Sequence, residues 1–144
     1  MPESTKPPRS YRDLNVWQKA VELAEEVYRL AKKLPKNEEF GLASQLRRAT
    51  ISIAANVAEG HARRSSRDFQ RFLGIAHGSL VEVETLLHLG NRIGHFTVAD
   101  VEKSLEIARH LGGMLGAFRA ALNKQSSVPA AVSRQPSAAL AAVG

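Results

Sequence analysis

The stretch spanning residues 40–60 carries more apolar surface than a helix packed on one side needs. It reads FGLASQLRRATISIAANVAEG. One set of apolar residues recurs every three or four positions, so it falls on one face of an α-helix: Leu42, Leu46, Ala49, Ile53 and Val57. A second row lies on another side of the same helix and consists of Ile51, Ala54 and Ala58. Because one apolar stripe is enough for a helix packed on one side, this helix should be covered twice.

Two explanations of the second apolar row stay open. The helix could lie at the centre of a monomeric core, covered on both sides by its own chain. Alternatively, the second row packs against another subunit and forms an oligomer interface. We favour the second explanation, because a chain of 144 residues has few helices with which to surround a central one.

Length and composition limit the class of protein. A chain of 144 residues is long enough for one domain with a substantial core. It has no cysteine, which excludes disulfides and thiolate metal sites. No apolar run approaches the roughly 18 to 20 residues that span a bilayer, and the N-terminus has no apolar segment typical of a signal peptide. We therefore expect a soluble, cytoplasmic protein without membrane contact.

The positive charge is concentrated in the middle of the chain. The formal net charge is +6 and the isoelectric point about 10.1, which favours anionic partners such as nucleic acid. Residues 41–77 contain six basic and two acidic side chains, and all six basic residues are arginines. The planar guanidinium binds phosphate oxygens in a bidentate manner. This block is therefore the candidate region for phosphate contacts.

Helical periodicity predicts an all-α fold. Apolar residues recur with a helical period over about residues 14–34, 38–59, 66–92 and 98–123, and no segment has the alternation of a strand. Ser65 with Asp68, and Thr97 with Asp100, have the spacing of capping boxes before the third and fourth segments. Gly74 and Gly78 lie in the middle of the third segment, where they favour the close approach of a neighbouring helix.

The predicted organisation is a single bundle with two unstructured ends. Short links between the helices favour antiparallel neighbours, and thus an up-down-up-down four-helix bundle over residues 11–124. Residues 1–10 contain three prolines and no apolar period, so we expect a flexible N-terminus. Residues 125–144 carry one charge and two prolines, so we expect a disordered C-terminal tail.

The sequence also resembles a known family. The characteristic segments are YRDLNVWQKAVELAEEVYRLAKKLP at 11–35, GLASQLRRATISIAANVAEG at 41–60, RFLGIA at 71–76 and GSL at 78–80. They resemble the four-helix-bundle proteins encoded in intervening sequences of bacterial 23S ribosomal RNA genes, over about residues 11–122. One departure is the Ala54-Ala55 pair, where the family pattern has a proline or serine between the isoleucine and the asparagine.

This resemblance implies an assembly and a set of partners. It implies that the bundle forms a homopentamer shaped like a barrel, whose neighbouring subunits would cover the second apolar row. A related branch comprises the accessory proteins of diversity-generating retroelements, which bind nucleic acid and act with a reverse transcriptase. The resemblance therefore implies RNA or DNA as a partner. A second possibility is that the chain serves as a protein-interaction scaffold for an enzyme such as a reverse transcriptase.

The arginines are the predicted nucleic-acid-binding residues. Arg63, Arg67 and Arg71 are spaced by four, so they lie along one side of a helix, and Arg64 extends the group in the preceding loop. Arg47 and Arg48 are weaker candidates, because they lie within the most apolar helix, where a structural role is the alternative. The alternative for the whole set is a solvated, non-functional face. No aromatic residue alternates with these arginines at the surface, so stacking on single-stranded bases is not indicated.

Little in the sequence indicates an enzyme. No two histidines have the spacing of a metal site on one helix, and we expect neither a metal nor a cofactor. Arg71 and His77, with five residues between them, resemble the Arg and His pair of some helical-bundle ribonucleases, in which the two stabilise a phosphate and transfer protons. That spacing often arises by chance and places the two side chains on different sides of a helix. The sequence therefore favours a binding protein without catalytic residues.

Overall fold

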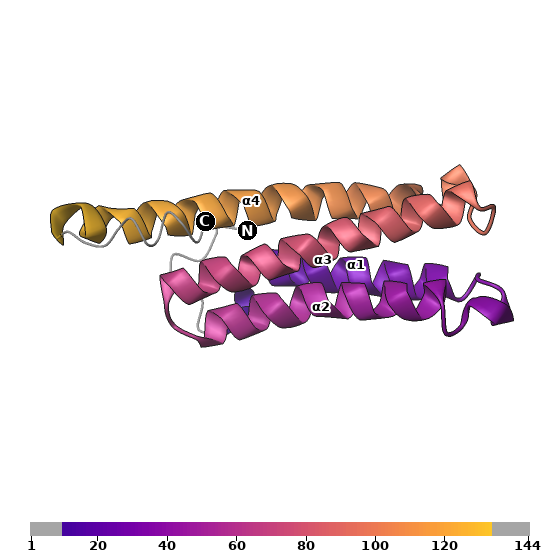
Figure 1. The fold of residues 1–144 in the computed structure, drawn as a ribbon, viewed down its shortest axis with the longest axis horizontal. Coiled ribbons are helices and arrows are strands. Elements are labelled where there is room, and N and C mark those ends of the chain that lie inside the picture. Colours follow the sequence, from indigo (N-terminus) through magenta and orange to yellow (C-terminus); the bar gives the residue numbers. More distant parts are fainter. Residues whose placement is uncertain (1–9, 134–144) are drawn as a thin grey trace.

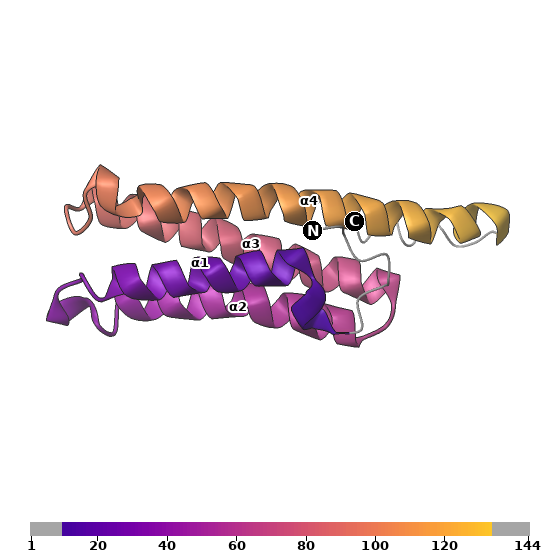
Figure 2. The same cartoon turned by 180° about the vertical axis from the view of Figure 1, so that it is seen from behind.

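The fold is an antiparallel bundle of four long helices. A computed structural model describes the backbone of residues 10–133 and the side chains of residues 10–125. The helices are α1 (Asn15–Ala31), α2 (Leu42–Ala62), α3 (Ser66–Arg92) and α4 (Val98–Ser133), with two short 3-10 turns, η1 (Tyr11–Asp13) and η2 (Lys36–Glu38). Consecutive helices run in opposite directions, and α4 returns beside α1 (Figures 1 and 2). Residues 10–133 contain no strand, which confirms the predicted all-α class with four helices.

The first two helices begin later than the sequence predicts. Helix α1 begins at Asn15 with Leu14 as its N-cap, because the preceding residues Tyr11–Asp13 form η1. Helix α2 begins at Leu42 because the preceding residues form η2 and a turn. A carboxylate oxygen of Glu38 accepts a hydrogen bond from the backbone N–H of Leu42 at 3.1 Å. A side chain four residues upstream thus satisfies one of the free N–H groups at the start of α2.

The bounds of the third helix and the Thr97–Asp100 capping box are confirmed, and Ser65 caps the third helix through one hydrogen bond. Helix α3 spans Ser66–Arg92, and the Ser65 hydroxyl accepts a hydrogen bond from the backbone N–H of Asp68 at 3.3 Å. At the start of α4, Thr97 and Asp100 exchange hydrogen bonds between side chain and backbone in both directions, at 2.9 and 3.0 Å. Both helix starts therefore follow from local sequence alone.

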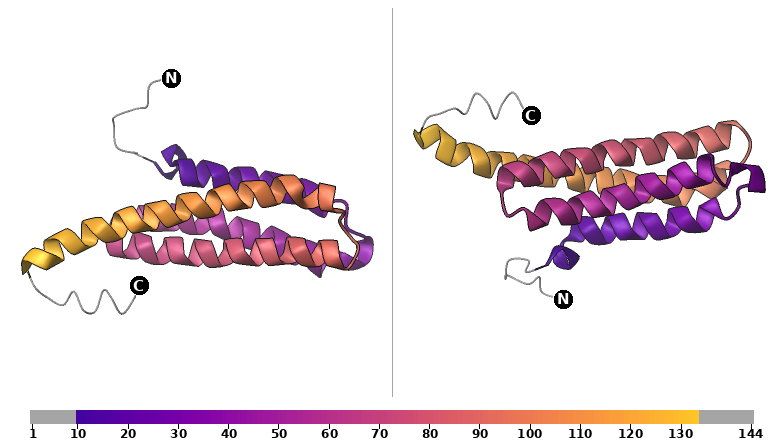
Figure 3. Two further views of the ribbon diagram at one scale, coloured as in Figure 1. Left: turned by 90° about the horizontal axis from the view of Figure 1, so that it is seen from above. Right: turned by 60° about the horizontal axis from the view of Figure 1, so that its bottom comes forward.

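The fourth helix is longer than predicted. It continues past Asn123 to Ser133, and its end projects beyond the turn between α2 and α3 (Figures 1 and 3). The last part of α4 lacks apolar periodicity, so the sequence pattern does not predict that it is helical. The rest of the predicted tail, residues 134–144, lies outside the described residues, as does the predicted flexible N-terminus apart from Ser10.

The core consists of one apolar face from each helix. The first apolar row of α2 is buried along its whole length, with exposed fractions of 0 to 6%. It packs with large buried side chains of the other helices, among them Leu23, Leu73, Leu80, Leu111 and Leu115. The chain itself covers the second row only in part: Ile51 is 50% exposed, Ala58 is half-buried, and Ala54 is half-buried and packs against the core. A single subunit therefore covers the first row of α2 fully and leaves Ile51 of the second row exposed.

Two buried glycines allow close packing of the helices. A Cβ atom at Gly60 would lie 2.8 Å from Phe72 Cβ and 2.9 Å from Phe69 Cδ1. A Cβ atom at Gly90 would lie 2.6 Å from the ring of Phe96. The predicted close approach of a neighbouring helix at Gly78 is wrong, because nothing lies within 4 Å of the position that its Cβ atom would take.

Among the helices of the described chain, none has the length and apolarity that a membrane span requires.

Candidate nucleic-acid interface

The turn between α2 and α3 carries most of the predicted phosphate-binding arginines. Arg63 is the C-cap residue of α2, Arg64 follows it with a φ of 56°, and Ser65 caps α3. The left-handed conformation of Arg64 reverses the chain within these residues. Four arginines therefore lie at one end of the bundle, and all are exposed: Arg63, Arg64, Arg67 and Arg71. We call these residues the arginine cluster.

The ring of Phe72 brings two members of the arginine cluster together. The Cζ atom of Arg63 lies 5.2 Å from the ring centroid, and that of Arg71 lies 4.6 Å from it. Both distances are within the range of cation–π attraction. Gly60 contributes, because its missing side chain lets the end of α2 approach Phe72 closely enough for Arg63 to reach the ring. The ring therefore orders two guanidinium groups from different helices, which lowers the entropy that a bound phosphate would have to remove.

The charges of the arginine cluster are only partly balanced. Arg63 pairs with Glu59 at 3.0 Å, but both side chains are about half exposed, so solvent screens the pair. Arg64 and Arg67 have no ion pair within the described residues. The nearby acidic side chains are Glu59 and Asp68. The end of the bundle formed by the turn between α2 and α3 thus keeps a net positive charge, as phosphate binding requires.

Arg47 and Arg48, the weaker candidates for nucleic-acid binding, lie apart from the arginine cluster. They lie near the start of α2, and Arg63 lies sixteen residues further along, which is about 24 Å by helical rise. Arg47 pairs with Glu39 at 2.9 Å and thus ties α2 to the link that precedes it. Arg48 is exposed on the outer side of α2. The six arginines therefore form two separate groups, because a straight helix keeps its two ends apart.

Arg119 of α4 was not predicted, although the structure places it beside the arginine cluster. The guanidinium of Arg119 lies against Gly74 of α3, since a Cβ atom at Gly74 would be 3.3 Å from Arg119 Nη2. Gly74 follows Arg71 by three residues on the same helix. The contact depends on the antiparallel register of α3 and α4, for which periodicity within one helix carries no signal. A glycine in the middle of an otherwise regular helix was the one available indication.

The structure does not bring Arg71 and His77 together. The two residues are six positions apart in α3, which corresponds to about 9 Å along the axis and about a third of a turn around it. The guanidinium of Arg71 is directed over Phe72. His77 is half-buried. Among the described residues, no hydrogen bond joins Arg71 to His77, and the Arg71 guanidinium contacts Phe72 instead.

The opposite end of the bundle is held by a histidine and a glutamate. His95, in the link between α3 and α4, lies 2.9 Å from the carboxylate of Glu38, in the link between α1 and α2. The backbone N–H of Leu42 and the His95 ring hold the pKa of Glu38 below its ordinary value. Within the described residues, histidine and carboxylate side chains form no group of three or more that could hold a metal ion. The Glu38–His95 contact therefore joins the two links.

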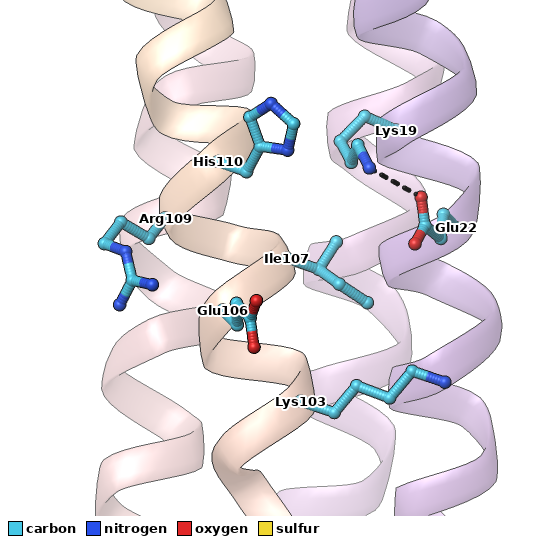
Figure 4. A pocket seen from close by; sticks show the side chains of 7 residues that line it. All are labelled: Lys19, Glu22, Lys103, Glu106, Ile107, Arg109 and His110. Atoms are coloured by element: carbon cyan, nitrogen blue, oxygen red, sulfur yellow. Dashed lines mark hydrogen bonds and ion pairs between the residues drawn. The ribbon is translucent and has the colours of Figure 1, made fainter.

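A groove between α1 and α4 is separate from the arginine cluster. It encloses about 530 Å³, with Ile107 at its apolar base. Its rim carries side chains of both charges (Figure 4): Lys19, Glu22, Lys103, Glu106, Arg109 and His110. Lys19 and Glu22 pair across one turn of α1 at 2.9 Å. None of the residues predicted for nucleic-acid binding or oligomerisation lines this groove.

The geometry defines a class of protein, and the comparisons identify the family. The molecule is an antiparallel four-helix-bundle protein with an exposed arginine cluster at one end. The family model described as "23S rRNA-intervening sequence protein" matches residues 12–117. The chain therefore belongs to this family, which confirms the resemblance seen in the sequence.

A solved structure supports the same assignment. A protein of unknown function from the S23 ribosomal protein family of Bacteroides thetaiotaomicron is 28% identical to this chain. The match covers 72% of this chain and 97% of that protein, with a TM-score of 0.67. No curated protein matches the chain. The family and the bundle fold are thus established.

Proposed function

We propose that this protein binds the phosphate backbone of nucleic acid, RNA or a DNA–RNA hybrid, without reading the base sequence and without catalysis. The observation that carries the proposal is the exposed arginine cluster at the turn between α2 and α3. Guanidinium groups there can neutralise phosphates and release counterions. The neighbouring aromatic rings, Phe69 and Phe72, are 91% buried and offer no free face for base stacking. These features favour contacts to the backbone only.

We further propose that the protein binds as a homo-oligomer, a pentamer as the family resemblance implies. The half-exposed Ile51 of α2 supports this proposal, together with Ala54 and Ala58 beside it. Burial of this row against a second copy would remove apolar surface from water. Several arginine clusters in one assembly would then engage several phosphates, and affinity would rise with their number. Measurement of the native mass tests the assembly: five subunits are expected, and a monomer at micromolar concentration would contradict it.

The binding proposal is tested by the salt dependence of affinity. Fluorescence anisotropy of a labelled RNA duplex should show log K falling linearly with log salt, by about 0.9 for each phosphate engaged. The triple variant Arg63→Glu, Arg64→Glu, Arg67→Glu should lose retention of the duplex without a change in native mass, because these side chains lie away from the second apolar row.

A matched variant controls for net charge. Lys32, Lys36 and Arg92 are exposed at the opposite end of the bundle, and no ion pair involves them within the described residues. Their reversal to glutamate changes the net charge by the same amount and should leave most of the affinity. Equal loss in both triple variants, or an affinity that does not vary with salt, would contradict a localised phosphate site.

A second candidate function is a scaffold that binds a partner enzyme such as a reverse transcriptase. The outer side of α3 favours it, because Ile75, Val81 and Leu89 are 44 to 47% exposed. Exposed apolar groups of this kind suit a protein interface. A variant in which all three are replaced by serine should lose such a partner while retaining the RNA duplex. Loss of the duplex in that variant would instead place the nucleic-acid site on the outer side of α3.

A further inference from the structure

We propose that Arg119 of α4 is a fifth phosphate-binding residue, held over Gly74 in line with Arg67 and Arg71. This inference rests on the function proposed above and extends the site from two helices to three. The Nη2 and Cζ atoms of Arg119 lie 3.3 and 3.7 Å from the position that a Cβ atom of Gly74 would take. The guanidinium therefore fills the space that a side chain at position 74 would occupy.

The position of Arg119 continues the row of arginines on α3. Positions 67, 71 and 74 are spaced by four and three residues, so they lie along one side of the helix. Arg67 and Arg71 fill the first two positions, and the guanidinium of Arg119 fills the third from the neighbouring helix. By helical rise, the three positions lie about 6 and 4.5 Å apart along the axis. Arg67, Arg71 and the guanidinium of Arg119 thus lie along one side of α3, where all three arginines are accessible to one bound strand.

Core packing fixes the position of α4 along α3, so that Arg119 lies level with Gly74. The ring of Phe118, the residue before Arg119, lies 5.0 Å from the ring of Phe69 in an edge-to-face contact. Phe69 is buried in the first turns of α3, next to the arginine cluster. The preceding side chain therefore anchors α4 to α3, and Arg119 follows at the surface, where it is half-buried. No ion pair within the described residues neutralises its charge.

A charge-matched pair of single variants tests the proposal. Arg119→Gln and Arg109→Gln each remove one positive charge from α4, but Arg109 is exposed at the groove between α1 and α4. With the labelled RNA duplex, Arg119→Gln should reduce the slope of log K against log salt by about 0.9 for each arginine cluster that contacts the RNA. Arg109→Gln should leave that slope unchanged. When the salt is raised from about 50 to 200 mM, the affinity of both variants falls. The factor by which it falls should be roughly 3.5 times smaller for Arg119→Gln than for Arg109→Gln.

A third variant tests the same position without replacing Arg119 itself. Gly74→Glu retains the Arg119 residue but displaces its guanidinium from position 74 and adds a carboxylate beside it, which should lower the slope by at least the same amount. If both Arg119→Gln and Gly74→Glu keep the wild-type slope while Arg67→Gln and Arg71→Gln reduce it, the role of Arg119 is refuted and the arginine cluster stands. If the wild-type protein does not retain the duplex, the proposed function itself fails, and the role of Arg119 fails with it.

Discussion

Replacement of Gly60 by alanine tests the close packing on which the arginine cluster depends. The added Cβ atom would lie 2.8 Å from Phe72 Cβ and 2.9 Å from Phe69 Cδ1, well inside ordinary van der Waals contact. Phe72 Cβ is bonded directly to the backbone, so rotation of a side chain cannot relieve that contact. The end of α2 must instead move away from α3 by roughly 1 Å, which weakens the packing of a dense core.

Two effects of opposite sign determine how much Gly60→Ala changes the free energy of unfolding. Overpacking of a well-packed core costs about 1 to 3 kcal/mol. Alanine is the better helix former and returns at most about 1 kcal/mol, less near a helix end. Gly60 lies in the last turn of α2, so the steric cost should dominate. We expect a net loss of about 1 to 2 kcal/mol, which for a bundle of this size corresponds to a fall in Tm of roughly 3 to 10 °C.

Thermal unfolding followed by far-UV circular dichroism measures this change. Both proteins must be compared at one protein concentration, because self-association would add to the apparent stability. Gly113→Ala is the matched control: Gly113 also lies inside a helix, but nothing lies within 4 Å of the position of its Cβ. That variant should gain up to about 1 kcal/mol from helix propensity alone. A Tm for Gly60→Ala equal to or above that of the wild type would refute the packing argument.

Three further predictions concern the core, the pH dependence and the assembly. Thr50→Val should stabilise the protein by about 1 to 2 kcal/mol in urea unfolding, because the Thr50 hydroxyl is buried without a hydrogen-bond partner; a loss of stability would show that the hydroxyl is satisfied. The lowered pKa of Glu38 means that this group stabilises the fold above its ordinary pKa of 4.5 and loses that contribution as pH falls through the folded value. As the pH falls below 4.5, the free energy of unfolding should therefore decrease less for Glu38→Gln than for the wild type. Identical pH profiles of the two proteins would contradict this. Ile51→Asp should dissociate the oligomer and leave helix content unchanged, because Ile51 is half exposed in the subunit; an unchanged native mass would place the interface elsewhere.

Local signals in the sequence were sufficient for much of the fold. Helix α3 spans Ser66–Arg92 as predicted, and its start follows from local sequence because the Ser65 hydroxyl accepts a hydrogen bond from the backbone N–H of Asp68. The prediction for α2 missed its start, because the Glu38 carboxylate caps Leu42 from a separate turn rather than continuing the helix. Here two local conformations compete, and propensity alone does not decide between them.

The candidate site was predictable only in part. The four-residue spacing correctly places Arg67 and Arg71 along one side of α3, but Arg63 is the C-cap of α2 and joins the arginine cluster across the turn. Arg47 is a weaker candidate in the sequence because of its place in the most apolar helix, and the length of α2 separates it from the arginine cluster. Arg119 was missed because it reaches the site across the packing of α4 on α3.

The sequence by itself determined the periodic features: which segments are helical, which face of each is apolar and where the capped helices begin. These features depend on neighbours within one or two helical turns, so they can be read from a single chain. The tertiary structure decided the rest. It left Ile51 uncovered, set Gly60 against Phe72 and placed the guanidinium of Arg119 over Gly74. Each of these contacts depends on the register and separation of packed helices, which arise from the whole core and not from any local pattern.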